Sequence, residues 1–218
     1  MAGIHGGYRN LPPLDATCGQ YALRCIANED AEPIRMWRNA QLAVLRQASP
    51  ISAGQQRRYF AEVIRAQMEL AEPQTILVTV LRHNTPIGYG GLVHCAWEHR
   101  RAEISILFTP EIADDPVAYR SSLLAFLAMI EEIAFTQLGL NRLTLETYDI
   151  RPLHIGVLEE AGYSREGRLR EHVTIDGQPV DSLLHAKLAS ARDAAAATGA
   201  RMTSCDTRAI RMPAGGGS

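Results

Sequence analysis

The chain has 218 residues, a length that suits one domain of ordinary size with a short tail. Hydrophobic residues make up 46% of it and charged residues 21%, which are the proportions of a soluble globular protein. A formal net charge of -2 gives no reason to expect a polyanionic partner, so the composition argues against a nucleic-acid-binding function.

The cysteines and the apolar stretches of the sequence both bear on the compartment of the protein. Four cysteines lie far apart with no C-x-x-C pair, which suggests neither a zinc site nor a disulfide framework; they are Cys18, Cys25, Cys95 and Cys205. The N-terminal segment lacks the apolar core of a signal peptide, and no stretch approaches about 18 uninterrupted apolar residues. We therefore expect a cytoplasmic protein with reduced thiols, no metal and no membrane contact.

The first half of the sequence alternates a loose segment with strand patterns. Residues 1–20 are rich in Gly and Pro and show no periodicity, so we expect a flexible arm there. Runs of apolar and β-branched residues then predict four strands, at residues 21–27, 75–81, 87–95 and 101–108. Short connections join the last three of these strands, which favours antiparallel pairing.

Two helices are expected between the first two of these strands. The first follows Asn28, a residue type suited to a helix N-cap, and ends near Asn39. The second begins with a capping box formed by Ser52 and Gln55 and runs to about Leu70. Its helical period predicts four buried side chains, those of Tyr59, Phe60, Val63 and Ile64.

The second half of the domain is predicted to begin with a long helix at residues 116–138, with Asp114 or Asp115 as its N-cap. A strand, a short helix and two hairpin strands follow, at residues 142–148, 152–161, 163–174 and 179–188. Because a helix connects the strand at 101–108 to the strand at 142–148, these two should pair in parallel. Residues 189–218 read as an Ala-rich extension followed by a disordered tail.

Several motifs of the second half occur together in one known family. The segment AFTQLGLNRL spans residues 134–143, a helix closes in LEEAGY at 158–163, and EGRLREH spans 166–172 before an Asp-Gly turn. Together with RAEISILF at 101–108, these segments resemble the GNAT superfamily of N-acetyltransferases, in the branch that acetylates ribosomal-protein N-termini or amino sugars. The resemblance covers residues 21–188, which we take as the acyltransferase domain.

The resemblance implies an α/β fold of the α+β kind, with a mixed, mostly antiparallel central sheet of about seven strands and helices on both faces. In the family, the two parallel strands splay apart, and the acyl-pantetheine arm of acetyl-CoA enters the gap between them. The resemblance therefore implies acetyl-CoA as co-substrate, bound beside Ile106, Leu107 and Phe108.

The sequence departs from the family where the pyrophosphate of the cofactor binds. Most members carry R/Q-x-x-G-x-G/A before the long helix, where small residues let backbone N-H groups reach the phosphates. Ala118, Ser121 and Leu123 align with three positions of this motif, and none of them matches. We expect the anion to be met instead by amides, hydroxyls and a guanidinium from Tyr119, Arg120, Ser121 and Ser122.

Glu103, near the start of the strand at 101–108, is the candidate general base. Acyl transfer needs a neutral amine, and a primary amine with a pKa of about 10.4 is mostly protonated at neutral pH. The AEI segment around Glu103 resembles the one in which histone-acetylating members carry their catalytic glutamate. The alternative is that Glu103 lies on a solvated sheet face or pairs with Arg100, Arg101 or Arg142.

Two further family positions are altered. The tyrosine that protonates the departing thiolate falls at Leu158, and the asparagine near the start of that helix falls at Arg151. A thiol pKa of about 8.5 makes thiolate a fair leaving group, so the loss need not abolish catalysis. Asp149 and His154 lie nearby and are the candidate catalytic replacements, although Asp149 could instead cap the following helix.

The acceptor is expected to bind a polar wall made by residues from three segments. The segment IRMWRN resembles the substrate side of acetyltransferases acting on nucleotide-linked amino sugars, where Trp37 can stack on a ring and Arg38 can bind a phosphate or carboxylate. His94 and Arg151 are placed to join them. Equally, Trp37 can be core, Arg38 surface and His94 structural.

The sequence therefore predicts an N-acetyltransferase that moves an acetyl group from acetyl-CoA to the primary amine of a small molecule, with a nucleotide-linked amino sugar favoured. One alternative is a protein N-terminal acetyltransferase of the ribosomal-protein type. Another is a degenerate module that binds acyl-CoA or an acyl-carrier protein without catalysis. The sequence leaves open the acceptor, the acyl length and whether the protein is a homodimer.

Overall fold

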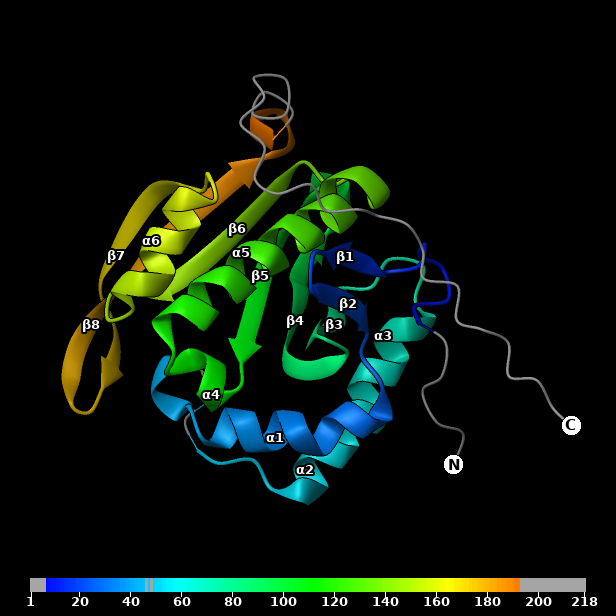
Figure 1. The fold of residues 1–218 in the computed structure, drawn as a ribbon, viewed down its shortest axis with the longest axis horizontal. Helices are drawn as coiled ribbons and strands as arrows, with labels where there is room; N and C mark the ends of the chain where they lie inside the picture. Colours follow the sequence, from blue (N-terminus) through cyan, green and yellow to red (C-terminus); the bar gives the residue numbers. More distant parts are fainter. Residues whose placement is uncertain (1–6, 46, 48, 193–218) are drawn as a thin grey trace, which may run out of the picture.

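The computed structural model describes residues 7–45, 47 and 49–192, and its centre is one eight-stranded sheet (Figure 1). The strand order is β1-β2-β3-β4-β5-β6-β8-β7. β5 and β6 run parallel, and the other neighbouring strands run antiparallel. The strands are β1 Ala16–Cys18, β2 Tyr21–Cys25, β3 Ile76–Arg82, β4 Thr85–Ala96, β5 Arg101–Phe108, β6 Arg142–Tyr148, β7 Ser164–Ile175 and β8 Gln178–Leu188.

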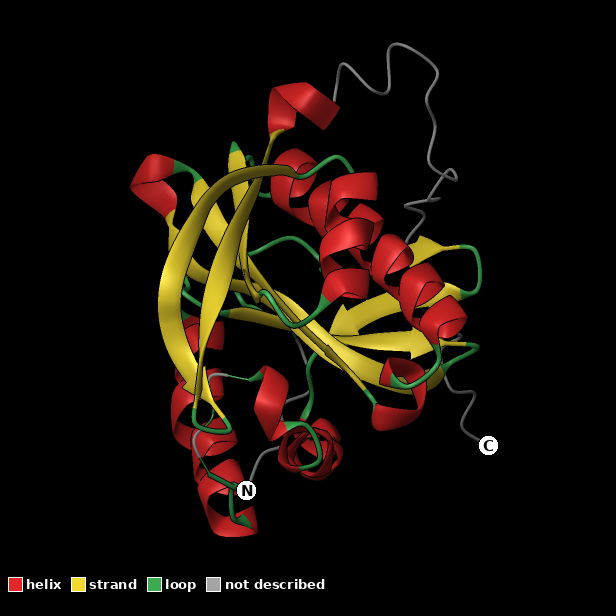
Figure 2. Cartoon of the chain, turned by 90° about the vertical axis from the view of Figure 1, so that its left-hand side faces the viewer, coloured by secondary structure: helices red, strands yellow, loops and turns green. Residues whose placement is uncertain are grey.

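Helices cover both faces of this sheet, as the side view in Figure 2 shows. Phe126 of α5 lies next to Gly90 of β4, whereas Arg38 of α1 bonds to Tyr89, whose side chain points to the opposite face. The two helical layers therefore sandwich β4 and its neighbours. The helices are α1 Ala31–Asn39, α2 Ala53–Arg58, α3 Arg65–Glu69, α4 Pro110–Ala113, α5 Pro116–Glu131 and α6 Pro152–Glu160.

Shorter helical turns connect or extend these elements. Three are 3-10 turns: η1 Asn28–Asp30, η2 Leu42–Val44 and η4 Trp97–His99. Two are π-helical segments: η3 Tyr59–Ile64, which joins α2 to α3, and η5 Glu132–Gln137, which extends α5. The helix predicted at residues 116–138 is therefore confirmed, and it ends before Gly139, whose φ of 66° is the left-handed conformation that glycine adopts readily.

The predicted parallel pair and its splay are confirmed. β5 and β6 pair over only three positions, and the last of these joins Glu103 to Thr144. Beyond it the strands separate, although β5 continues to Phe108 and β6 to Tyr148. The central sheet is thus open at its middle, and the opening lies at the C-terminal ends of the two parallel strands, where ligands of α/β proteins usually bind.

The N-terminal segment differs from the flexible arm expected for residues 1–20. Residues 16–18 form β1, which pairs with β2. The sheet therefore has eight strands, where the sequence predicted about seven. Tyr8 is buried, and its hydroxyl accepts a 2.8 Å hydrogen bond from the amide of Leu77. Leu14 is buried as well. These few apolar side chains are enough to hold the segment on the sheet, although they are too sparse to show a period in sequence.

The second predicted helix begins at the expected cap, but the set of side chains that it buries differs from the prediction. Ser52 and Gln55 form the reciprocal capping box, with the Gln55 amide donating to Ser52 Oγ and the Ser52 amide donating to Gln55 Oε1. Phe60 and Ile64 are buried, whereas Tyr59 and Val63 are each 42% exposed. The π-helical segment from Tyr59 to Ile64 departs from the 3.6-residue period, so the expected burial of Tyr59 and Val63 was wrong.

The glycines of β4 pack against neighbouring backbone. A Cβ added at Gly90 would lie 2.4 Å from the carbonyl oxygen of Ser105, and one at Gly91 would lie 2.0 Å from that of Ile76. Phe126 lies 3.0 Å from the same Cβ position at Gly90. These glycines therefore allow close contact with flanking strands and with α5.

One cysteine differs from the expectation of reduced thiols. Cys18 is disulfide-bonded, whereas Cys25 and Cys95 are free, and Cys205 lies outside the described residues.

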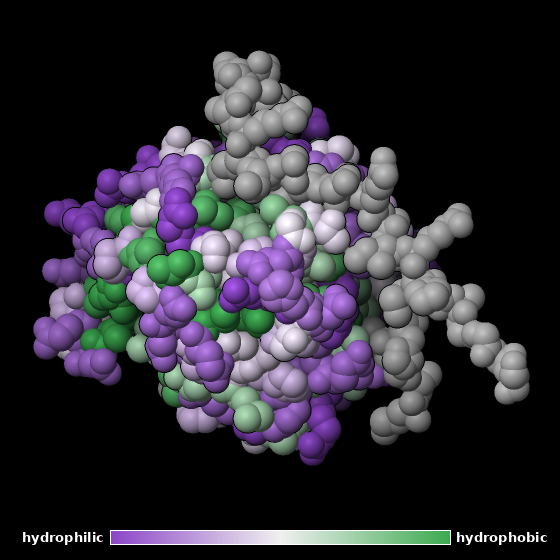
Figure 3. Space-filling model, viewed as in Figure 1, coloured by the Kyte–Doolittle hydropathy of each residue, from purple (hydrophilic) through white to green (hydrophobic). Residues whose placement is uncertain are grey.

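Most of the predicted C-terminal extension and tail, residues 193–218, lies outside the described residues. Within the described chain no helix is long and apolar enough to span a membrane. On the face seen in Figure 3, hydrophobic side chains are interspersed with hydrophilic ones.

Candidate active site

A cavity of about 620 Å³ opens where β5 and β6 separate. It passes between the two strands, because residues that point to both sheet faces line it, such as Glu103 and Ile104 on β5 and Glu146 and Leu145 on β6. Its outer wall comes from α1, η2, α2 and η3. The volume lies within the range of about 300–1,000 Å³ that is usual for small-molecule sites.

Two carboxylates belong to the wall of this cavity. Glu103 lies at the last paired position of β5, and Glu146 lies two residues beyond its counterpart Thr144 on β6. Both side chains are half-buried. Glu146 Oε1 also lies 3.4 Å from Nε2 of His172 on β7. The strand positions therefore place two acidic groups on the same wall, at the start of the opening.

A second cavity of about 350 Å³ adjoins the first near the start of α6. Val44, Arg151 and His154 line both cavities, so the two are neighbours across these side chains. The second cavity is otherwise lined by the segment between α1 and α2, the end of α4, and Tyr119 of α5. Together the cavities form a path from the first turns of α5 and α6 to the gap between the strands.

Three side chains at the junction of the cavities form a hydrogen-bonded network. Arg151 donates to the hydroxyl of Tyr119 at 2.7 Å, and that hydroxyl lies 2.6 Å from Nδ1 of His154. Arginine has no acceptor, so the Tyr119 oxygen accepts from Arg151 and its proton is available for Nδ1. We therefore assign His154 the neutral tautomer in which Nε2 carries the proton.

Burial determines the charge states of this network. His154 is only 4% exposed, and burial, followed by the charges of Arg151 and His185, holds its pKa well below the usual value. Burial also raises the pKa of Tyr119, against the opposing effect of Arg151. At neutral pH this three-residue network thus holds a neutral imidazole, a neutral phenol and one guanidinium cation.

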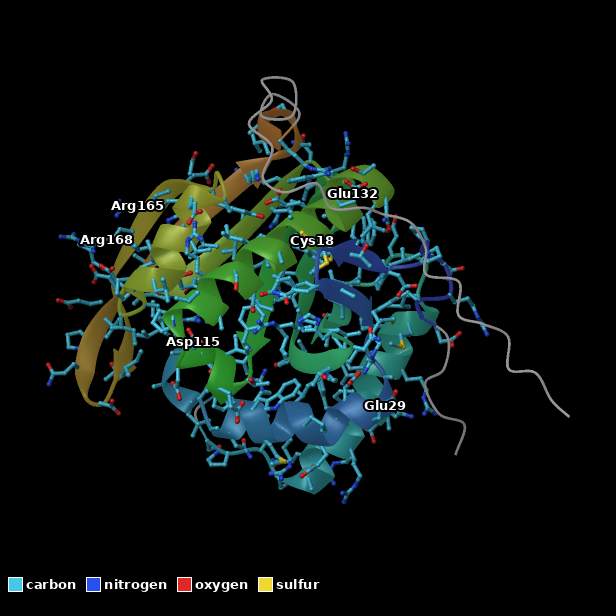
Figure 4. All side chains as sticks on the ribbon, in the orientation of Figure 1. Cys18, Glu29, Asp115, Glu132, Arg165 and Arg168 are labelled. Carbon is cyan, nitrogen blue, oxygen red and sulfur yellow. The ribbon has the colours of Figure 1, made fainter. Side chains whose placement is uncertain are left out.

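The N-terminus of α5 is already capped by an acidic side chain. Oδ1 of Asp115 accepts hydrogen bonds from the amides of Val117 at 2.9 Å and of Ala118 at 3.1 Å. The amide of Tyr119 donates to the Asp115 carbonyl at 2.8 Å. Figure 4 shows Asp115 at this end of the helix. The amides that an anion would meet at a helix N-terminus are therefore engaged by a carboxylate.

The other residues expected at the phosphates are also engaged elsewhere. Arg120 forms a bidentate ion pair with Glu160 of α6. The hydroxyl of Ser121 lies 3.0 Å from that of Tyr21, and Ser122 is fully buried. Tyr119 lines the smaller of the two cavities described above, and the other three residues line neither of them.

Of the residues expected beside the cofactor on β5, Ile106 lines the larger cavity. Leu107 and Phe108 are instead buried in the core, and the Phe108 ring packs edge-to-face against Tyr119 with centroids 5.6 Å apart. Phe108 therefore helps to hold the ring of Tyr119, one of the three hydrogen-bonded residues, in place.

The residues expected to bind the acceptor separate into two groups. Arg38, His94 and Arg151 line the larger cavity, whereas Trp37 is partly buried and packs against the hydrophobic core. His94 lies at a bulge between β4 and β5 and has a φ of 50°, an uncommon conformation for a residue other than glycine. Its exposed side chain therefore lies at the rim of the cavity.

The two candidates for the missing acid have different surroundings. His154 lies in the network described above. Asp149 forms an ion pair with Arg168 of β7, which Figure 4 shows on the outer hairpin, and lines neither cavity. Leu158, at the position of the family's tyrosine, is completely buried. The structure thus brings His154 to the site and leaves Asp149 outside it.

Sequence reasoning missed Tyr89 and Glu146 and did not connect Tyr119 to His154. Glu146 could have been found, because it lies on the same face as Tyr148 of the strand predicted to flank the gap. The contact of Tyr119 with His154 joins residues 35 positions apart on two helices, and no local pattern predicts it. Among the described residues, no group of three or more histidine, cysteine or acidic side chains could hold a metal ion.

A family model described as an acetyltransferase (GNAT) domain matches residues 23–184. A comparison with curated protein sequences gave no match.

Solved structures of spermidine N-acetyltransferase SpeG from Vibrio cholerae share the fold. A complex with CoA and spermine is 22% identical, with a TM-score of 0.68, and the alignment covers 79% of this chain and 97% of that one. A dodecameric form is 23% identical, with a TM-score of 0.66 and coverage of 79% and 95%.

Proposed function

Because the chain belongs to the GNAT family of acetyltransferases, we propose that it acetylates the primary amine of a small molecule, with acetyl-CoA as the donor. The observation that carries this proposal is the cavity at the separation of β5 and β6, whose wall includes the carboxylates of Glu103 and Glu146. Carboxylates are the groups that bind an ammonium and can accept its proton.

The larger cavity and the smaller one beside it fit a long, flexible donor. Ile106 and Leu145 give the gap apolar walls, while Arg151 and His154 supply polar groups where the two cavities meet. Acetyl-CoA supplies the acetyl group as an activated thioester. The fit is poorest at the N-terminus of α5, where Asp115 occupies the amides, so we expect weak binding of the pyrophosphate.

Glu103 is proposed as the group that accepts the proton of the amine. It belongs to the cavity wall where the strands part, so an acceptor nitrogen in the gap would lie beside it. Glu146 is on the neighbouring strand and would hold the same nitrogen by charge. The two carboxylates would thus divide orientation and proton removal between them.

His154 is proposed to act as a hydrogen-bond donor to the departing sulfur. Burial keeps its imidazole neutral, so His154 is a poor acid at neutral pH, but its Nε2–H can stabilise negative charge. Arg151 adds a positive charge at the same junction, and Tyr119 fixes the imidazole through Nδ1. This arrangement would take over the role that the family's tyrosine, replaced by Leu158, performs by protonation.

The proposal is tested by measuring release of free CoA from acetyl-CoA with a panel of acceptors. The panel contains spermidine, a nucleotide-linked amino sugar and a peptide with the N-terminus of a ribosomal protein. We expect a small amine to be acetylated and the peptide not to be. CoA release with the peptide alone would favour a protein N-terminal acetyltransferase. A melting temperature raised by acetyl-CoA, together with no release, would favour a module that binds acyl-CoA without catalysis, whereas an unchanged one with no release would favour a module for an acyl-carrier protein.

A further inference from the structure

Within residues 7–45, 47 and 49–192, two arginines of the larger cavity bond through their side chains to neutral partners alone. Arg38, near the end of α1, donates to the hydroxyl of Tyr89 at 2.5 Å and to Oε1 of Gln47 at 2.8 Å. Arg151 donates to Tyr119. Among the residues that the structure describes, no carboxylate forms an ion pair with either guanidinium. By contrast, Arg35, one turn before Arg38 on the same helix, pairs with Glu32.

A half-buried guanidinium without a counter-charge is costly, and a bound anion would offset that cost. Arg38 is half-buried on the acceptor side of the cavity, on the sheet face opposite α5. Arg151 lies instead at the junction with the second cavity, where the donor is proposed to bind. Arg38 is therefore the arginine that can meet the acceptor.

Tyr89 gives Arg38 a fixed position and a second donor. Its side chain is 7% exposed, and burial raises its pKa against the opposing charge of Arg38, so the hydroxyl keeps its proton at neutral pH. The oxygen accepts from Arg38, and within the described chain the O–H has no acceptor. A guanidinium and a phenol hydroxyl side by side can donate to two oxygens of one carboxylate or phosphate.

The pairing of β4 with β5 gives the distance from this donor pair to the proposed base. Tyr89 pairs with Leu107, and Glu103 lies four residues before Leu107 on the same face of the sheet. At a strand rise of about 3.3 Å per residue, the two points are on the order of 13 Å apart along the strand. An extended acceptor with a basic end and an acidic end would span them.

We propose that the acceptor is zwitterionic: a primary amine on a skeleton that also carries a carboxylate or phosphate, which Arg38 and Tyr89 bind. This inference rests on the proposed function and narrows it. It distinguishes the protein from an enzyme for polycations such as spermidine, which offer no anion to Arg38. Carboxylate and phosphate share the chemistry of recognition, and the experiment separates them.

The experiment compares amines that differ only in the anion. Lysine and 1,5-diaminopentane differ by one carboxylate, and glucosamine 6-phosphate and glucosamine differ by one phosphate. We expect the anionic member of one pair to have a higher kcat/KM by about 10- to 100-fold, the range of charge-assisted hydrogen bonds. The pair that shows the effect identifies the anion. The same member should raise the melting temperature without acetyl-CoA, whereas its partner without the anion should not.

Variants then connect the preference to the site. Arg38→Gln and Tyr89→Phe should raise KM for the amine that carries the anion and leave KM for its partner without the anion within about twofold. Arg58→Gln is the matched control, because Arg58 is exposed at the end of α2 and lines neither cavity. Tyr89→Phe keeps the ring, so it tests the site even where Arg38→Gln unfolds the protein.

Three results would overturn the inference. Faster acetylation of spermidine or 1,5-diaminopentane than of either anionic amine would show that Arg38 does not select the acceptor. A preference for the anion that survives both variants would place its binding elsewhere. In both cases the proposed acetyltransferase function would stand. If no amine releases CoA, the proposed function itself fails, and the inference fails with it.

Discussion

Asp115 Oδ1 accepts a 2.9 Å hydrogen bond from the backbone amide of Val117, so an acidic side chain closes the N-terminus of α5. The cap stabilises the helix, since it satisfies amides that would otherwise lack a partner and places negative charge at the positive end of the dipole. It also competes with any phosphate that approaches the same amides. Helix stability and anion binding are thus in conflict at this position.

Asp115→Asn should therefore strengthen the binding of acetyl-CoA. Asparagine is as good an N-cap as aspartate but carries no charge, so the helix should keep its stability. Removing about 1 kcal/mol of repulsion should lower KM for acetyl-CoA about fivefold at low ionic strength, and less at high salt. Steady-state kinetics at two salt concentrations measure this, with melting temperature as the folding control. An unchanged KM would place the pyrophosphate away from α5.

Glu103→Gln should lower kcat by about 10² to 10⁴, with little change in acetyl-CoA affinity, if Glu103 is the base. The remaining activity should rise with pH, because the amine then supplies its own neutral fraction. Glu146→Gln, in the same cavity, should mainly raise KM for the amine. Turnover is measured against pH for both variants, alongside their melting temperatures. A kcat near the wild-type value for Glu103→Gln at neutral pH would remove Glu103 from the mechanism.

His154 should make the protein less stable in mild acid. Its folded-state pKa lies well below its unfolded value of about 6.5, so below that pH the unfolded chain binds a proton that the folded chain does not. The free energy of unfolding should fall with falling pH, by up to about 1.4 kcal/mol per pH unit, down to the folded-state pKa.

Urea denaturation from pH 8 to pH 5 measures this dependence. His154→Gln should lose part of it, while His185, whose pKa burial also lowers, keeps the rest. His99→Gln, at an exposed position on η4, should follow the wild-type curve. If wild type and His154→Gln show the same slope, the imidazole is protonated or solvated in the folded state.

Gly90→Ala and Gly156→Ala should change stability in opposite directions. A Cβ at Gly90 would lie 2.4 Å from the Ser105 carbonyl oxygen, and overpacking costs about 1–3 kcal/mol. Gly156 lies within α6 with no atom within 4 Å of an added Cβ, so alanine should stabilise by about 0.5–1 kcal/mol. Chemical denaturation of both variants gives the two values. A Gly90→Ala variant as stable as the wild type would mean that β4 shifts to accept the methyl group.

Most of the fold could be predicted because long elements repeat their pattern. β6 was predicted with its observed bounds, since apolar and polar residues alternate over Arg142–Tyr148. The hairpin turn at Asp176 and Gly177 has positive φ at both residues, which this dipeptide favours. β1 and α4 were missed because three and four residues are too short to show a period.

The site could be predicted only where a single strand carries it. Glu103 was found from its strand motif and does line the cavity. The phosphate residues were inferred from their place near the start of α5, but Arg120 reaches Glu160 on another helix and Ser121 reaches Tyr21 on a strand. Such partners depend on tertiary packing, and the sequence around each residue does not predict them.

The opening between β5 and β6 divides the sheet into two lobes, which three residue pairs join. One lobe holds β1 to β5, and the other holds β6, β8 and β7. α5 crosses between them, since it contacts β1 and β2 on one side and α6 on the other. The buried side chains of α5 therefore connect the two lobes where few strand hydrogen bonds do so. We expect the two lobes to unfold together only while this helix stays packed against both.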